Sequence, residues 1–172
     1  MESLPYTKIP DYPKQYTASS ILIRLLDGLG FRYRWATEGL TESDYMFRPS
    51  PDSMSVKELL SHINYLVNMV DYCFGGEKPR APADTSLHGI RFATLSKVLS
   101  IRTKLVNMSP SQLQSCKYHS DTIEADFPIW NIVNGPICDA LTHVGQLNSW
   151  RRLNGNPVQA ANVFLGTPPQ SI

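Results

Sequence analysis

The sequence predicts an all-α protein built as a four-helix bundle. Apolar residues recur at helical spacing in four long stretches, and segments rich in proline or glycine separate these stretches. Two of the stretches also carry ionisable residues, His62, Asp139 and His143, on the faces expected to point inward. Helix bundles build metal sites from facing side chains of this kind. With 172 residues, a single domain is the default expectation.

The first helix is expected over residues 17–39, where leucines recur every three or four positions. A loop should follow over 41–52, because two prolines block a helix there. The second helix is expected over 55–74 and ends at a pair of glycines. After a proline-containing linker over 77–86, the third helix should occupy 88–107, with a basic outer side that we interpret as a solvated face.

The last helix is the longest predicted element and follows an irregular segment. Residues 117–124 alternate weakly between polar and apolar, which indicates a short strand or hairpin. Asp126, followed by Pro128, predicts the start of the helix, and Gly155 its end. Pro136 lies inside this range, so either the helix truly begins there or the proline kinks one long helix.

The two ends of the chain are expected to lie on the bundle. Residues 1–15 contain three prolines and should form an extended arm. Residues 156–172 should form a tail that folds back over the helices, because they include apolar side chains that favour burial.

Composition excludes several function classes. The formal net charge is +1 and no basic run is interleaved with aromatic residues, so nucleic acid is not an expected partner. The first residues lack the apolar core of a signal peptide, and no stretch has the length of a membrane span, so no membrane partner is expected. The three cysteines are odd in number and form no CxxC motif, which is typical of reduced thiols in the cytoplasm.

Three residues form the candidate metal site. Asp139 and His143 are four positions apart, so a helix places them on one face, one turn from each other. His62 lies on the apolar face of the second predicted helix and also points inward. A buried charge needs a partner or a metal. The three groups therefore form either a metal site of two histidines and one carboxylate with open positions, or a His–Asp pair beside an unrelated core histidine.

Other residues near these positions have competing interpretations. Glu58 falls near the His62 face, but its spacing from Ser55 fits a capping box, which is the favoured interpretation. Gln146 and Trp150 follow His143 by one and two turns and are candidates for contact with the ligands. His119 is a conceivable fourth ligand, although a surface position in a loop is favoured.

Two segments together resemble a known family. Residues 134–146 read NGPICDALTHVGQ and are followed by Arg151-Arg152 and by Gly155-Asn156-Pro157. This pattern resembles the last helix of the DinB/YfiT-like metalloenzyme superfamily. Residues 58–63, ELLSHI, resemble the segment of its second helix that provides a metal ligand. The resemblance extends from residue 17 to about residue 160.

The resemblance implies an up-down-down-up four-helix bundle that is often a homodimer. Members typically hold a divalent metal with three histidines, one on the second helix and two on the last. His62 and His143 match two of these positions, and Asp139 replaces the third histidine. A carboxylate still binds metal, and zinc or nickel is expected ahead of iron or manganese.

The resemblance also suggests an activity. Characterised members include transferases that conjugate a low-molecular-weight thiol to an electrophile, so a small thiol and an electrophile are the expected partners. Two alternatives stay open: a metal-dependent hydrolase, and a non-enzymatic stress-response protein with a structural metal site. An open coordination position distinguishes a catalytic site from a structural one.

Overall fold

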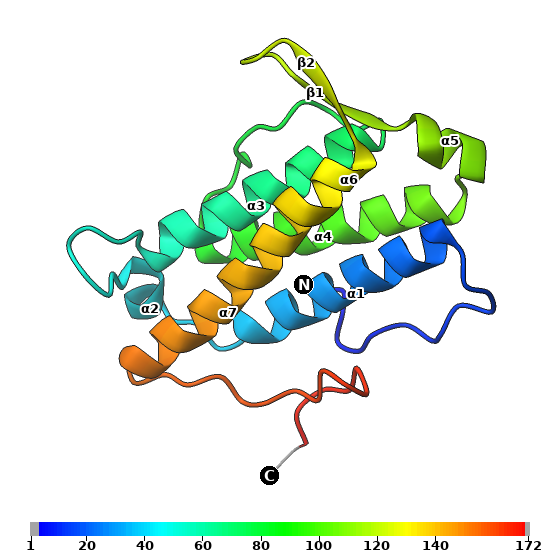
Figure 1. The fold of residues 1–172 in the computed structure, drawn as a ribbon. Helices are drawn as coiled ribbons and strands as arrows, with labels where there is room; N and C mark the ends of the chain where they lie inside the picture. The colour runs from blue at the N-terminus through cyan, green and yellow to red at the C-terminus, as the bar shows by residue number, and fades with distance from the viewer. Residues whose placement is uncertain (1–3, 171–172) are drawn as a thin grey trace.

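The computed structural model describes residues 4–170, so the first three residues of the predicted arm and the last two of the predicted tail lie outside it. The protein is mostly helical, as the sequence predicted, with one small sheet. Its four long helices are α1 (Ala18–Ala36), α3 (Val56–Cys73), α4 (Leu87–Val106) and α7 (Cys138–Leu153). Each long helix packs against two others, because α1 and α3 both contact α4 and α7 (Figure 1).

The predicted hairpin before the last helix is confirmed. Strands β1 (Lys117–Ser120) and β2 (Ala125–Pro128) pair antiparallel, with Tyr118 opposite Phe127. Asp126 lies in β2 and does not cap a helix, so that prediction was wrong. Its carboxylate instead accepts a hydrogen bond from Nδ1 of His119 across the hairpin, at 2.9 Å. Strand pairing and this side-chain contact therefore use the residue that the capping pattern had assigned to the helix start.

The last helical segment adjusts its hydrogen bonding around Pro136. It begins as α6 (Ile129–Ile132), continues through a π-helical turn, η1 (Val133–Ile137), and becomes α7. A proline removes one backbone donor and crowds the preceding turn, and a wider π turn relieves that crowding. The two alternatives left open by the sequence are therefore resolved as one continuous segment with a local change of winding.

Two short helices were missed and lie in segments expected to be loops. These are α2 (Glu42–Met46) and α5 (Pro110–Ser115). Each begins with a capping box, Thr41 with Asp44 in the first and Ser109 with Gln112 in the second. A reciprocal pair of capping hydrogen bonds stabilises a single turn that is too short to show an apolar period.

The start of α3 follows the predicted capping box. The backbone amide of Ser55 donates to a carboxylate oxygen of Glu58 at 2.6 Å, and the Ser55 hydroxyl accepts from the Glu58 amide. The helix ends before Gly75, which has a φ of +78° that a glycine adopts without strain. These two signals fix α3 and therefore the position of His62 along it.

The basic side of α4 is not the solvated face that the sequence suggested. Lys97 and Lys104 both contact the buried carboxylate of Asp71 on α3, at 3.0 and 2.6 Å. Arg102 contacts the buried carboxylate of Asp27 on α1 at 3.0 Å. Because a buried carboxylate requires a cation or hydrogen-bond donors, these side chains bend toward the neighbouring helices. These ion pairs join α4 to α3 and to α1.

The arm lies against α1, and the tail contacts the arm. The apolar side chains of the tail are not buried as the sequence suggested, because Val163, Phe164 and Leu165 are 48%, 88% and 58% exposed. Tyr6 is buried, and its ring packs so closely on Gly30 of α1 that a Cβ there would lie 2.7 Å from a ring carbon. The amide of Ile9 donates to the carbonyl of Gly166 at 2.9 Å, so the tail is bound to the arm. Within residues 4–170, no helix combines the length and apolar character needed to cross a membrane.

Candidate metal centre

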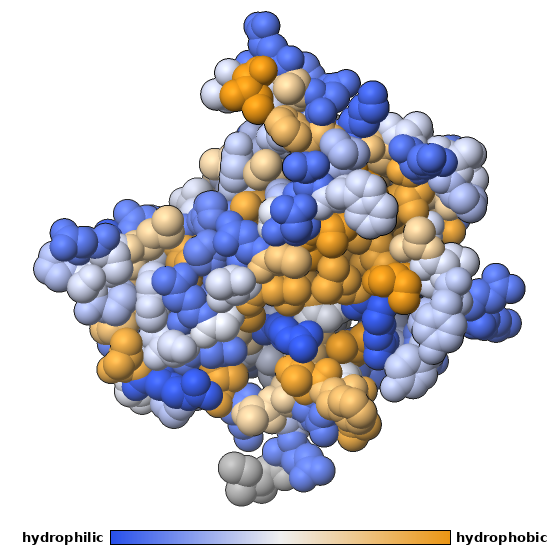
Figure 2. Space-filling view, in the orientation of Figure 1, coloured by the Kyte–Doolittle hydropathy of each residue, from blue (hydrophilic) through white to orange (hydrophobic). Residues whose placement is uncertain are grey.

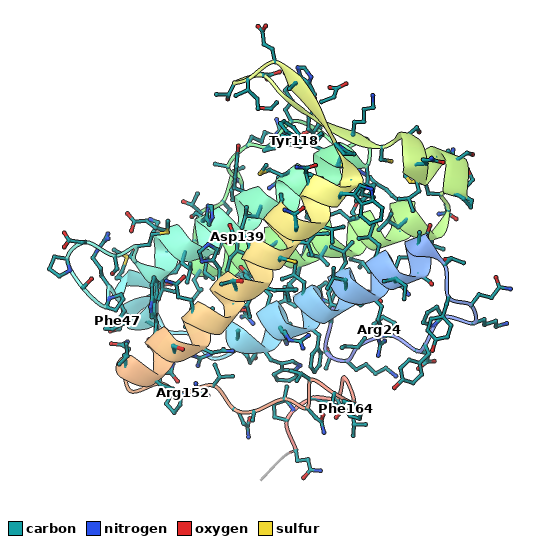
Figure 3. The ribbon with its side chains drawn as sticks, viewed as in Figure 1. Arg24, Phe47, Tyr118, Asp139, Arg152 and Phe164 are labelled. Carbon is teal, nitrogen blue, oxygen red and sulfur yellow. The ribbon has the colours of Figure 1, made fainter. Side chains whose placement is uncertain are left out.

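The three predicted ligands converge where α3 and α7 pack together. Nε2 of His62 on α3 lies 3.5 Å from Oδ2 of Asp139 on α7. Nε2 of His143, one turn further along α7, lies 3.4 Å from Oδ1 of the same carboxylate. The carboxylate thus lies between two imidazoles and directs a different oxygen at each. Figure 3 shows Asp139 at the border between the two helices.

The two imidazoles also contact each other. Their ring centroids are 4.8 Å apart and their planes are nearly perpendicular, at 83°. One nitrogen or oxygen from each of the three side chains lies within 4.8 Å of the others. With both imidazoles neutral, the group carries the single negative charge of Asp139, so it attracts a cation.

Gln146 holds the ring of His143. Its Oε1 lies 2.8 Å from Nδ1 of His143, so a neutral His143 that donates from Nδ1 directs an unprotonated Nε2 toward Asp139. A metal-binding histidine commonly donates its second ring N–H to an oxygen in this way, which fixes its tautomer and orientation. The prediction that Gln146 contacts a ligand is therefore consistent with the structure.

The group is more exposed than the sequence suggested. The exposed fractions of the side chains are 33% for His62, 46% for Asp139 and 18% for His143. On α7 the fully buried stripe contains Ala140, Val144 and Leu147. Asp139 and His143 each precede a member of that stripe by one residue, and one residue rotates a helix by about 100°. They therefore lie on the edge of the packed face, where solvent reaches them.

The donor types, and two of the separations between them, fit a divalent ion. Ligand atoms about 2.0–2.2 Å from a tetrahedral or octahedral ion lie about 2.8–3.6 Å from one another. The two carboxylate-to-imidazole distances, 3.4 and 3.5 Å, fall within that interval, although they end on different oxygens of Asp139. The donor set spans up to 4.8 Å, so the side chains must move closer together to share one ion. Two imidazole nitrogens and a carboxylate oxygen suit zinc, nickel, iron and manganese. The residues present therefore fit the group that the sequence predicted, and the exposed edge leaves room for further ligands.

The other candidate residues lie elsewhere. The carboxylate of Glu58 accepts hydrogen bonds from the Ser55 amide and from the guanidinium of Arg48, the latter at 2.8 Å. Glu58 therefore stabilises the start of α3. His119 lies in the hairpin with Asp126 and is not part of the group. Trp150 is buried in the hydrophobic core, and its contact with the ligands stays a prediction.

Tyr65 is a neighbour of His62 along α3 that the sequence did not single out. Tyr65 follows His62 by three positions on α3 and is 44% exposed. Residues three apart on a helix are neighbours on its surface, so this spacing was the signal that would have found it.

A comparison with family models finds no match for this chain, and a comparison with curated proteins finds none either.

Proposed function

We propose that this protein binds one divalent metal ion through His62, Asp139 and His143 and uses it in catalysis. The observation that carries the proposal is the convergence of these three side chains, within 4.8 Å, from two different helices. Helix packing alone does not require three metal-binding side chains at one point of contact. Their partial exposure favours a catalytic centre over a closed structural one, because a structural site shields all positions of its metal.

We further propose membership in the DinB-like superfamily, with its up-down-down-up bundle. Support comes from the residue pattern around His62 and His143 and from the directions of the long helices. In Figure 1, α1 and α7 run in one direction, whereas α3 and α4 run in the opposite one. A long connection, residues 74–86, links the two consecutive helices that run the same way. Asp139 in place of a histidine is the main departure from the pattern.

The proposed reaction joins a low-molecular-weight thiol to an electrophile. A divalent ion bound here would supply Lewis acidity that favours the thiolate over the thiol. The sulfur donates an electron pair to an electrophilic carbon and forms the S–C bond. The bond from that carbon to its leaving atom breaks, the leaving atom keeps the electron pair, and the proton released by the thiol balances its charge.

The roles of the protein groups follow from their contacts. Gln146 orients the ring of His143. One carboxylate oxygen of Asp139 faces His62 and the other faces His143. When one of these oxygens binds the metal, the other is free to accept a hydrogen bond. The exposed edge between α3 and α7 provides access for both substrates. We also propose a cytoplasmic location, since Cys73, Cys116 and Cys138 are all free thiols.

Metal analysis of the purified protein, combined with a thiol-conjugation screen, tests this function. Glutathione and bacillithiol would be offered with an epoxide and with 1-chloro-2,4-dinitrobenzene, before and after removal of metal. We expect about one ion per chain and conjugation that depends on it. A His143→Ala variant should lose both. Metal-dependent release of product from ester or amide substrates, without conjugation, would instead favour a hydrolase. A protein that holds metal but turns over neither class would contradict the catalytic proposal.

A further inference from the structure

A row of aromatic side chains leads away from the triad along α3. Tyr65 and Tyr72 follow His62 by three and ten positions, which places all three on one side of the helix. The Cβ atoms of residues three apart on a helix are about 5–6 Å from each other, so the ring of Tyr65 begins one turn from the imidazole of His62. Tyr65 is 44% exposed, so part of its ring is available to a ligand.

The hairpin contacts this row at Tyr72, the end that is further from His62. Tyr118 on β1 packs edge-on against Tyr72, with ring centroids 5.6 Å apart and planes at 90°. Burial, with the nearby phenols of Tyr65 and Tyr72, raises the pKa of the Tyr118 hydroxyl. Tyr118 is therefore a neighbour of both α3 tyrosines. Figure 3 places Tyr118 near the end of α3 where the hairpin meets it, and Asp139 further along the same border.

We propose that Tyr65, supported by Tyr118, forms an aromatic wall of the metal site that selects ligands carrying a flat ring beside their metal-binding atom. The inference rests on the proposed function and specifies its substrate class: an aromatic or heteroaromatic thiol or electrophile. Tyr65 acts here as a specificity residue, which contacts the bound ligand and leaves the ion itself to the triad.

The physical argument is that this ring is partly exposed and lies beside Tyr118 of the hairpin. Aromatic pairs contribute beyond simple burial of area, and tyrosine provides contact area with few rotatable bonds. An aromatic side chain that is already restrained by neighbours loses little entropy when a ligand stacks on it. If Tyr65 served only to attach the hairpin to α3, its removal would affect stability and leave ligand choice unchanged.

The test uses the protein loaded with Co²⁺, whose visible absorption reports the ligands of the ion. Benzyl mercaptan and cyclohexylmethanethiol have similar size, but only the first has a flat ring. Titration of each thiol, followed by the thiolate-to-cobalt absorption, gives two dissociation constants. Their ratio is compared between the wild type, Tyr65→Ala, Tyr65→Phe and the control Tyr16→Ala, which removes a tyrosine that is 95% exposed ahead of α1.

We expect Tyr65→Ala to reduce the preference for benzyl mercaptan by about 3- to 10-fold, the effect of one aromatic pair. Tyr65→Phe and Tyr16→Ala should keep the wild-type ratio. Tyr65→Leu, which retains apolar volume, replaces the alanine variant if that variant unfolds. An unchanged ratio in Tyr65→Ala, with cobalt still bound, would overturn this inference alone. Failure of the wild type to bind cobalt at the triad would overturn the proposed function, and the inference with it.

Discussion

Nδ1 of His143 lies 2.8 Å from Oε1 of Gln146, the residue that follows it by three positions on α7. This contact leaves Nε2 of the same ring facing Asp139 and His62. The orientation of one proposed ligand is therefore set within its own helix, independently of α3.

Replacing Gln146 tests that contact. Gln146→Leu should weaken metal affinity by about 10- to 100-fold, because the ring then loses the acceptor that fixes its tautomer. Gln146 is exposed, so the fold should be retained. Gln146→Glu keeps an acceptor oxygen and should bind at least as tightly as the wild type. Calorimetric titration of the metal-stripped proteins gives the affinities, and equal values for the wild type and the leucine variant would show that the contact is incidental.

Substitutions of Asp139 test the one carboxylate among the three proposed ligands. Asp139→Asn should reduce metal affinity by about 100-fold or more, because an amide oxygen is a poor metal ligand. This loss is larger than the one expected for Gln146→Leu. Asp139→His should retain binding and shift the preference toward zinc. Competition between zinc and manganese for each variant measures that shift. Wild-type affinity and stoichiometry in Asp139→Asn would mean that Asp139 only orients the histidines.

A polar cluster at the other end of α7 predicts acid sensitivity. Burial alone would raise the pKa of Asp44, but hydrogen bonds from Thr41, Asn156 and Asn154 lower it to about 2. The two asparagine amides lie 2.7 Å from its oxygens. A carboxylate with a lowered pKa stabilises the fold above the pKa of the unfolded chain, and this contribution is lost as the pH falls toward 2.

The expected contribution of Asp44 at neutral pH is about 2 kcal/mol. Urea unfolding of the wild type and Asp44→Asn at several pH values between 7 and 2 measures it. The difference in free energy of unfolding should be largest above about pH 4 and should shrink as the solution is acidified. Asp52→Asn, an exposed aspartate in the next loop, is the matched control. A difference that stays constant over this range would rule out the ionisation of Asp44 as its source.

The surface predicts a homodimer. Hydrophobic side chains gather on the face between α7 and α1 (Figure 2), and Ile21 of α1 and Phe164 of the tail are 57% and 88% exposed. Apolar surface of this kind commonly marks an association site. Light scattering at micromolar concentration should give the mass of two chains, and Ile21→Lys should lower it toward that of one. A wild-type mass of 19.3 kDa would contradict this prediction.

Much of the helical framework was predictable because its signals are local. The Ser55–Glu58 capping box and the glycines after Phe74 marked α3, and the four-residue spacing of Asp139 and His143 placed both on one face of α7. Spacing alone did not resolve the burial of Asp139 and His143, because a rotation of one residue separates these side chains from the buried stripe. Their exposure became visible only once α3 and α7 were packed together.

The errors arose where local patterns competed with contacts distant in sequence. Asp126 had the pattern of a helix cap, but pairing of β1 with β2 placed it opposite His119. The lysines of α4 had the pattern of a solvated face, but the buried carboxylate of Asp71 on α3 attracts them. In both cases the partner lies in another element, and no window along one helix contains it.

Zinc titration of the metal-stripped protein, compared with His62→Ala, tests the central claim most directly. His62 is the only proposed ligand from α3, so its removal leaves the pair on α7 intact. We predict one ion per wild-type chain, a loss of about 100-fold or more in affinity for the variant, and stabilisation of the wild type by about 2.7 kcal/mol when free zinc is about 100 times Kd. Failure of the wild type to bind zinc, or the same affinity in His62→Ala, would contradict a metal centre shared by α3 and α7.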